Sequence, residues 1–317
     1  MIRRLAVLAA IAGLSVSLAA CHDMPMVAAV HPMAGPIRLT ATPVPLNPNA
    51  PAQTVLGQFR YAGGLALTSP DTARLHGLSD LRIAPDGLTL HAQGDEGDRF
   101  DARLVLDAAG RLTGLTAGHI DRLTGPGGRL LSGKAHTDAE GLAYLANGGR
   151  LVSFERDNRI LYYPPDGGPT TAAPFPPAAF EANSGVEALT EFPMAGPDAY
   201  LAGGEQGGIW LCRLSARCAP LPQLLPLPIS FGLSSLAVAP PAGQGEAPPV
   251  LAVLQRAWDP ILGSRVVVTL LRLDGGPGAP LRPVVLDRLS LASPLTRDNF
   301  EGVALVSRVT QGCLPVS

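Results

Sequence analysis

A short pattern recurs five times along the chain at long intervals. Each copy begins with an acidic residue or a serine, continues through a small residue or aspartate to an aliphatic residue, and usually ends on an apolar one. The copies occupy residues 79–83, 140–144, 187–191, 234–238 and 301–305, so their starts are 61, 47, 47 and 67 residues apart. An irregular interval of about 50 residues is typical of propeller blades joined by loops of variable length.

Each copy is followed by a turn and a second apolar stretch. Pro85-Asp86-Gly87 and Asn147-Gly148-Gly149 are strong hairpin signals, and residues 102–115 and 264–291 contain further alternating stretches. The chain holds 36 glycines and 32 prolines, which fits many turns, and helical periodicity is nearly absent after residue 21. We therefore predict an all-β fold, a β-propeller with five to six blades. A β-sandwich is the alternative, but polar clusters at fixed places in each unit favour the propeller.

The first residues have the features of a bacterial export signal. Arg3 and Arg4 precede an apolar stretch that is too short for a spanning helix and that ends in Leu18-Ala19-Ala20-Cys21. This ending resembles a lipoprotein lipobox, which implies cleavage before Cys21 and lipid attachment to its sulfur; an ordinary signal peptide is the alternative. We predict a lipoprotein signal peptide over residues 1–20, a flexible tether over 21–54 and the propeller over 55–317. The protein is then exported and lipid-anchored, in the periplasm or on the outer membrane.

Three further cysteines follow the predicted lipidation site. An oxidising periplasm would permit a Cys212–Cys218 bridge across a hairpin, which would leave Cys313 unpaired, and a free buried pair is the alternative. The net charge of −2 gives no basic excess for binding nucleic acid. The oligomeric state stays open.

Acidic residues open or close strands in most of the repeated units. Innermost strands line the channel of a propeller, so these residues are expected to converge near one mouth of it. They are Asp80, Asp95, Glu96, Glu140, Glu155, Glu187, Glu205 and Glu301. Carboxylates brought together raise one another's pKa unless a cation neutralises them, and Ca²⁺ is a suitable hard cation. The alternative is a structural role, in which the acids cap strand ends or pair with Arg99, Arg156, Arg256 and Arg297.

Several motifs together resemble the phytase-like proteins of bacteria, described as having the esterase-like activity of phytase. They include "YAGGLAL", "GLSDLRIAPDG", "DAEGLAYL", "SFERDNRILYY", "NSGVEALTEF" and "NFEGVAL", and they span about residues 55–306. The resemblance implies an exported propeller that hydrolyses phosphoesters or esters. Members usually continue after "FEGVAL" with a further strand and an acidic turn, whereas this chain continues with "VSRVTQGCLPVS". The last blade is therefore expected to be incomplete.

The resemblance also assigns roles to residues. We expect Glu140, Glu155, Glu187 and Glu205 to be catalytic, Arg99, Lys134, Arg156 and Arg256 to bind substrate, and Asp95, Glu96 and Glu301 to hold a metal ion such as Ca²⁺. The leading hypothesis is a metal-assisted hydrolase of a small phosphoester or ester. The alternative is a non-enzymatic propeller that binds an envelope component or a partner protein. A serine hydrolase is disfavoured because the chain has no G-x-S-x-G elbow.

Overall fold

The computed structural model describes residues 34–181, 183–221, 230–239, 248–275 and 280–306. The chain divides into two units, residues 1–30 and 31–317, and all described residues belong to the second. The predicted signal peptide, Cys21 and Cys313 lie outside the described residues. Within these residues, no helix has the length and apolar character needed to cross a membrane.

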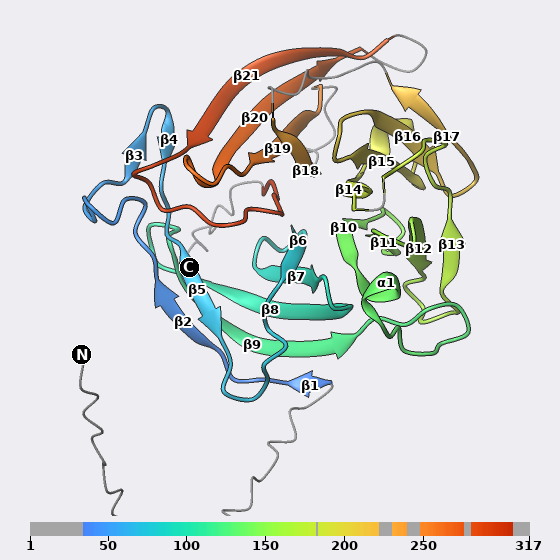
Figure 1. The fold of residues 1–317 in the computed structure, drawn as a ribbon, viewed down its shortest axis with the longest axis horizontal. Helices are drawn as coiled ribbons and strands as arrows, with labels where there is room; N and C mark the ends of the chain where they lie inside the picture. Colours follow the sequence, from blue (N-terminus) through green and yellow to red (C-terminus); the bar gives the residue numbers. More distant parts are fainter. Residues whose placement is uncertain (1–33, 182, 222–229, 240–247, 276–279, 307–317) are drawn as a thin grey trace, which may run out of the picture. The chain divides into compact units, whose positions relative to one another are not determined.

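Four antiparallel sheets form the blades of a β-propeller (Figure 1). The first sheet contains β6 (Leu78–Ile83), β7 (Thr89–Gly94), β8 (Asp98–Leu106), β9 (Leu112–Arg122) and β1 (Gly35–Pro36). The second contains β10 (Ala139–Tyr144), β11 (Arg150–Phe154), β12 (Arg159–Tyr163) and β13 (Thr171–Ala173). The third contains β14 (Val186–Glu191), β15 (Ala199–Gly204), β16 (Ile209–Arg213) and β17 (Ala216–Leu221). The fourth contains β18 (Gly232–Val238), β19 (Val250–Ala257), β20 (Arg265–Asp274) and β21 (Arg282–Leu291).

The remaining described elements are short. Two small sheets pair β2 (Thr40–Pro43) with β5 (Leu65–Thr68) and β3 (Val55–Leu56) with β4 (Phe59–Arg60). The helices are α1 (Lys134–Thr137) and the 3-10 turn η1 (Pro193–Ala195). The all-β prediction is confirmed, with almost no helix among the described residues.

Apolar residues fill the spaces between neighbouring blades. One buried cluster joins Leu151 and Ile160 of the second sheet to Leu189 and Tyr200 of the third. Another joins the third sheet to the fourth, for example through Leu201 and Leu236. Because both faces of the middle strands are covered, they carry nearly continuous apolar runs. Most of the stabilisation of the ring therefore comes from burial between sheets.

The predicted count of five to six blades is not confirmed, because the described strands form four. The fifth repeat, residues 301–305, is nevertheless next to the first and fourth blades. Its Val303 N–H donates to Ser235 Oγ at 3.2 Å, and its Val303 carbonyl accepts a hydrogen bond from Arg82 Nη1 at 3.1 Å. Residues 301–305 do not form a regular strand. This segment occupies a fifth position around the axis, between the fourth and first blades.

The structure differs from the predicted flexible tether over residues 34–54. β1 pairs with β9 and β2 pairs with β5, and Ile37 is buried beside Phe100 and Ile120. Thr296 donates its N–H and hydroxyl to the carbonyls of Leu46 and Pro45, so this segment also contacts the residues after β21. The proline-rich composition suggested a tether, but prolines are tolerated in short edge strands.

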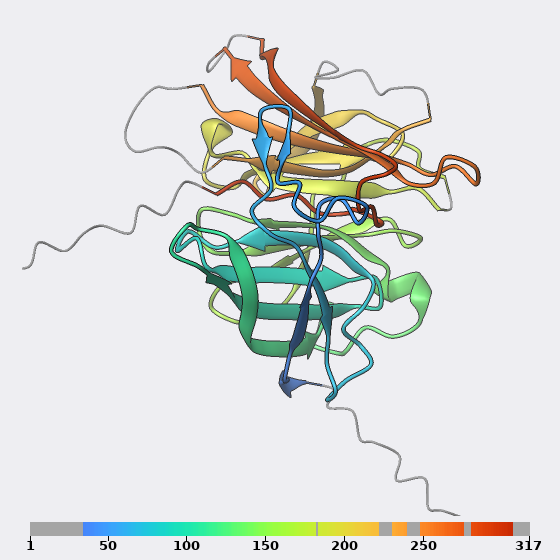
Figure 2. The same cartoon turned by 90° about the vertical axis from the view of Figure 1, so that its left-hand side faces the viewer.

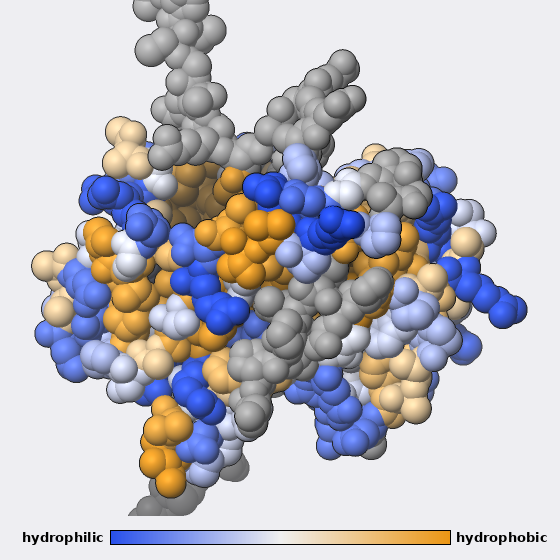
Figure 3. Space-filling view, turned by 90° about the horizontal axis from the view of Figure 1, so that it is seen from above, coloured by the Kyte–Doolittle hydropathy of each residue, from blue (hydrophilic) through white to orange (hydrophobic). Residues whose placement is uncertain are grey.

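Cys212 and Cys218 form a disulfide between β16 and β17. The bridge expected from the oxidising compartment is therefore present, and both cysteines are buried within the cluster between the second and third sheets. The outer strand of the fourth sheet, β21, leaves Val284, Val285 and Leu286 exposed. Figure 3 shows apolar surface on this side of the molecule, interrupted by hydrophilic residues.

Candidate functional site

A β-bulge occurs at the start of the first strand in every blade. The pairing registers of β6, β10, β14 and β18 with their second strands all shift at the first residue of the repeat. Ser79, Glu187 and Ser234 are each the extra residue, and Glu140 shares its bulge with Gly141. Bulges re-aim a side chain relative to the regular pleat. The repeated position is thereby placed at one end of the inner strands in each blade.

Side chains of one blade hold the bulge of the next. Gln93 on β7 donates from Nε2 to the carbonyls of Glu140 and Gly141, each at 2.9 Å. Ser153 on β11 donates to the Val186 carbonyl at 2.6 Å. These buried bonds satisfy carbonyl groups that the bulges release from the ladder. They also fix the positions of Glu140 and Glu187 relative to the neighbouring sheet.

The predicted acidic residues lie close enough together to affect one another's pKa values. The pKa of Glu140 is raised well above its usual range, first by burial and then by Glu187, Asp138, Glu301 and Glu155. The pKa of Glu187 is raised in the same way, by burial and then by Glu205 and Glu155. Mutual repulsion of this kind requires the carboxyl groups to lie close together in poorly hydrated surroundings. The acids contributed by separate blades therefore form one site.

Asp138, Glu140 and Glu155 form the densest part of this site. One carboxylate oxygen from each lies within 4.8 Å of the others. Asp138 is buried, and its carboxylate forms ion pairs with Lys134 Nζ and Arg156 Nε, each at 2.5 Å. Lys134, on α1, also pairs with Asp95 at 2.8 Å. The turn that carries Arg156 is strained, since this arginine has a φ of 59°, in the left-handed region.

Glu301 brings the fifth repeat into the same site. Its carboxylate accepts from Arg256 Nη1 at 2.7 Å, and Asn299 is hydrogen-bonded to both residues. Burial raises the pKa of Glu301, Arg256 lowers it and Asp95 raises it. We call the whole set the acidic cluster; its members are Asp95, Asp138, Glu140, Glu155, Glu187, Glu205, Glu301, Lys134, Arg156 and Arg256. It thus brings together seven carboxyl groups and three cationic groups.

Two residues assigned to the site from the sequence have different surroundings. Glu96 is half-exposed, and its carboxylate lies 3.8 Å from Nε2 of His76. Arg99 lies on β8 and pairs with Asp101 at 3.0 Å and with Asp121 on β9 at 3.5 Å, toward the outer edge of the blade. The structure brings the other nine assigned residues, from Asp95 to Glu301, into the acidic cluster.

The structure adds Asp138 to the predicted set. It precedes Glu140 by two residues, in "TDAEGL", and could have been recognised from its place between Lys134 and Glu140. Among the residues that the structure describes, the group suited to a metal ion is therefore Asp138, Glu140 and Glu155, whereas the sequence assigned that role to Asp95, Glu96 and Glu301. The difference arises because α1 turns Asp138 back against the end of β11, where the Asp138 carbonyl accepts the Glu155 N–H.

Arg82 and Asp80 lie near the axis of the propeller and connect the inner strands of several blades. Arg82 donates to carbonyls on three other inner segments, those of Leu189, Leu236 and Val303. Asp80 accepts from Leu142 N–H at 2.8 Å, Ser235 Oγ at 3.0 Å and Arg82 Nη1 at 3.0 Å. Burial raises the pKa of Asp80 to about 6. The sequence grouped Asp80 with the converging acids, but here it links blades.

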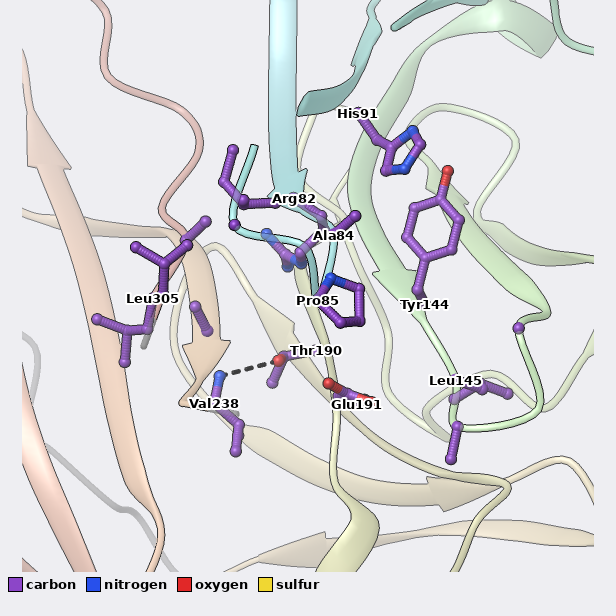
Figure 4. A pocket seen from close by; sticks show the side chains of 17 residues that line it. Arg82, Ala84, Pro85, His91, Tyr144, Leu145, Thr190, Glu191, Val238 and Leu305 are labelled. Atoms are coloured by element: carbon purple, nitrogen blue, oxygen red, sulfur yellow. Dashed lines mark hydrogen bonds between the residues drawn. The ribbon is translucent and has the colours of Figure 1, made fainter. Parts of the chain in front are cut away.

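A cavity of about 650 Å³ lies on the opposite side of Arg82 (Figure 4). Its walls come from the final residues of the inner strands, such as Tyr144, Glu191 and Val238, together with Leu305. Because the acidic cluster lies at the beginning of the same strands, the cavity and the cluster are at opposite ends of the axis. The cavity is therefore separate from the residues that carry the clustered charges.

Comparison with known families supports the resemblance seen in the sequence. The family model described as phytase-like, with esterase-like activity of phytase, matches residues 73–314. The chain belongs to the phytase-like family. The match includes every member of the acidic cluster. The comparison with curated proteins finds no match.

Two solved structures that are similar to this phytase-like protein are remote. One is the Cps50 (Swd1) β-propeller domain of Myceliophteria thermophila, with 10% identity, a TM-score of 0.33 and coverage of 67% of this chain and 72% of that one. Another is the dihydro-heme d1 dehydrogenase NirN in complex with DHE, with 13% identity, a TM-score of 0.33 and coverage of 70% and 51%. Structural similarity at this TM-score does not indicate a shared function.

Proposed function

We propose that the acidic cluster binds a divalent cation, Ca²⁺ above all, and that the cation-loaded site hydrolyses small phosphoesters. The observation that supports this most strongly is the charge balance of the cluster. Seven carboxyl groups share the site with three cationic groups, and the pKa values of Glu140 and Glu187 are raised first by burial and then by repulsion from the neighbouring carboxylates. A bound hard cation would relieve that repulsion.

The residues fit Ca²⁺ in the chemistry of their donor atoms. Calcium prefers several oxygen ligands, chiefly carboxylates, in flexible geometry. Asp138, Glu140 and Glu155 offer carboxylate oxygens within 4.8 Å of one another. They come from α1's C-terminal end, β10 and the turn after β11, so binding would tie these elements together. These three residues would hold the ion.

The other members of the cluster are suited to binding and to proton transfer. A bound Ca²⁺ would supply concentrated positive charge that stabilises negative charge developing on a phosphoryl group. Lys134 and Arg156 have side chains that are 44% and 43% exposed, so both can donate to phosphate oxygens as well as to Asp138. Glu187, whose pKa is raised chiefly by burial, is suited to exchange a proton with water or a leaving group.

Activity and cation binding should be measured on the same variants. Purified protein is assayed with p-nitrophenyl phosphate and with myo-inositol hexakisphosphate, after chelation and after Ca²⁺ is restored. We expect activity only with Ca²⁺, and Glu140→Gln should weaken Ca²⁺ binding by at least the roughly 10- to 100-fold that loss of a residue supporting the ligands usually costs. Glu96→Gln is the matched control, because Glu96 lies beside His76. Full turnover in excess chelator would contradict the proposal.

A cation that only stabilises the ring is the second candidate. Arg256 links Glu301 of the fifth repeat to the fourth blade, and Lys134, Arg156 and Arg256 are all already paired with carboxylates. The protein would then be a non-enzymatic propeller that binds an envelope component or partner protein. Raised thermal stability in Ca²⁺ together with no turnover on a phosphoester and ester panel would favour this candidate.

We also propose that the protein is exported and anchored by lipid on Cys21. The lipobox-like residues 18–21 support this location, which would place the acidic cluster in an envelope compartment. Radiolabelled palmitate should label the intact chain, and Cys21→Ser should abolish the label. Labelling that persists in the variant would contradict the assignment.

A further inference from the structure

The loop between β19 and β20, residues 258–264, presents unusually exposed apolar side chains. Ile261 is 91% exposed and Trp258 is 70% exposed, the two highest values among the large apolar residues that the structure describes. Leu262 is 56% exposed. In Figure 2 this loop, orange, projects on the same side as the green α1. It therefore extends from the end of the propeller that carries the acidic cluster.

The loop is held rigidly in this conformation. Asp259 Oδ1 accepts the N–H groups of Ile261 and Leu262, each at 2.8 Å, and Gly263 N–H donates to the Asp259 carbonyl at 2.7 Å. Gly263 adopts a φ of 69°, which favours glycine. Arg297 donates from Nη1 to the carbonyls of Leu262, at 2.8 Å, and Ser264, at 3.3 Å. These bonds satisfy the backbone internally and leave the apolar side chains facing outward.

A bilayer surface matches this shape better than a protein partner does. Three large side chains on a protruding loop can bury on the order of 500 Å², whereas a stable protein interface covers about 800 Å² on each side. Tryptophan also favours the membrane–water interface, where its ring is apolar and its N–H remains hydrated. Insertion of a few ångströms would bury these side chains without unpaired backbone groups.

The structure also shortens the connection between the predicted lipid and the propeller. Because residues 34–54 belong to the folded unit, only residues 22–33 separate Cys21 from it. Twelve residues span at most about 40 Å when fully extended. A lipid on Cys21 would therefore keep the propeller close to the bilayer, within reach of a short loop.

We infer that the loop of residues 258–264 inserts into the interface of a phospholipid bilayer through Trp258, Ile261 and Leu262. This interaction is independent of the proposed hydrolysis, and lipidation of Cys21 would bring the loop within reach of the bilayer. The loop would give the propeller a second attachment point and a fixed orientation, with the acidic cluster on the membrane-facing side.

The test uses the mature chain, residues 21–317, with Cys21→Ser, so that neither a lipid nor the predicted signal peptide contributes. Vesicles of phosphatidylcholine are chosen because they carry no net charge, and the same lipid with brominated chains is the quencher. We expect Trp258 emission to shift to the blue and to be quenched, while Trp258→Phe, which leaves Trp210, removes both effects. Ile261→Ser with Leu262→Ser should lower vesicle partitioning by about tenfold or more.

The matched control is Val55→Ser with Leu130→Ser, which removes two other exposed apolar side chains, 52% and 56% exposed. It should bind vesicles like the parent. Thermal melts establish that both double variants are folded, since every altered side chain is exposed. Unchanged tryptophan emission with vesicles would overturn the inference, as would equal losses in both double variants. Loop-dependent self-association without vesicles would also overturn it, in favour of a protein partner.

Discussion

At the centre of the ring, Arg82 joins segments that are far apart in sequence. Its guanidinium donates to carbonyls of the third blade, the fourth blade and residue 303, while it also pairs with Asp80. The Asp80 side chain is completely buried, so its charge depends on this partner. Replacing both members of a buried ion pair by apolar residues is often neutral, but removing only one partner is costly because the other charge is left buried and unpaired.

Replacement of Arg82 therefore tests the closure of the ring. Arg82→Ala should lower the free energy of unfolding by about 3–5 kcal/mol, because Asp80 and several carbonyls lose their donor. Arg103→Ala is the comparison, since Arg103 pairs with Asp86 at 3.2 Å with half its side chain exposed; its cost should be below about 1 kcal/mol. Denaturant unfolding measures both. Equal costs would show that Arg82 does not stabilise the ring, and Arg82→Lys should recover part of the loss.

At the scale of elements, the β-bulges determine where the carboxyl groups of the acidic cluster can lie. A regular β14 would alternate its side chains between the two faces of the sheet, and the spaces between blades are filled by apolar clusters. The bulge at Glu187 releases this residue from the alternation, and the bonds from Gln93 and Ser153 hold neighbouring bulges in place. Carboxyl groups can then gather at one end of the strands without disturbing the core.

The hairpin of β16 and β17 has its own source of stability. Its disulfide closes a short loop, with a sequence separation of 6, and both sulfurs lie in the apolar cluster. Cys212→Ala with Cys218→Ala should lower the free energy of unfolding by about 2–3 kcal/mol, according to the loop-closure estimate. Calorimetry of the variant, compared with the reduced parent, measures this. A wild-type melting temperature in the variant would contradict the expectation.

At the scale of the whole molecule, the acidic cluster couples stability to pH and to cations. The unfolded chain releases the protons of Glu140 and Glu187 near the ordinary value of 4.5, whereas the folded chain retains them to higher pH. The folded state then binds more protons above that value. Its stability must therefore fall as pH rises through the neutral range.

Calcium should change this pH dependence. In excess chelator, the melting temperature should decrease from about pH 5 to about pH 9 by several degrees, on the order of 5 °C. Because Ca²⁺ binds the deprotonated carboxylates, its stabilising effect should grow over the same range. Glu140→Gln should flatten the slope in chelator. Scanning calorimetry tests this, and a melting temperature that rises with pH in chelator would contradict the coupling.

The repeat was sufficient to predict much of this phytase-like propeller. Short patterns and hairpin turns are local, so the sequence could indicate the strands, the family and most of the acidic cluster, from Glu140 to Glu301. The sequence failed where distant contacts override local composition. Residues 34–54 resemble a tether in composition, yet β1 and β2 pair with strands that come later in the chain.

Tertiary structure alone decided which charged residues share a site. Arg99 and Arg156 follow similar acidic turns in the sequence, but Arg99 lies toward the outer strands while Arg156 pairs with Asp138. The sequence groups Asp80 and not Asp138 with the converging acids, yet Asp138 belongs to the acidic cluster and Asp80 links blades. The sequence specifies which residue types recur and at what interval. Their convergence depends on bulges and inter-blade hydrogen bonds, which exist only once the ring has closed.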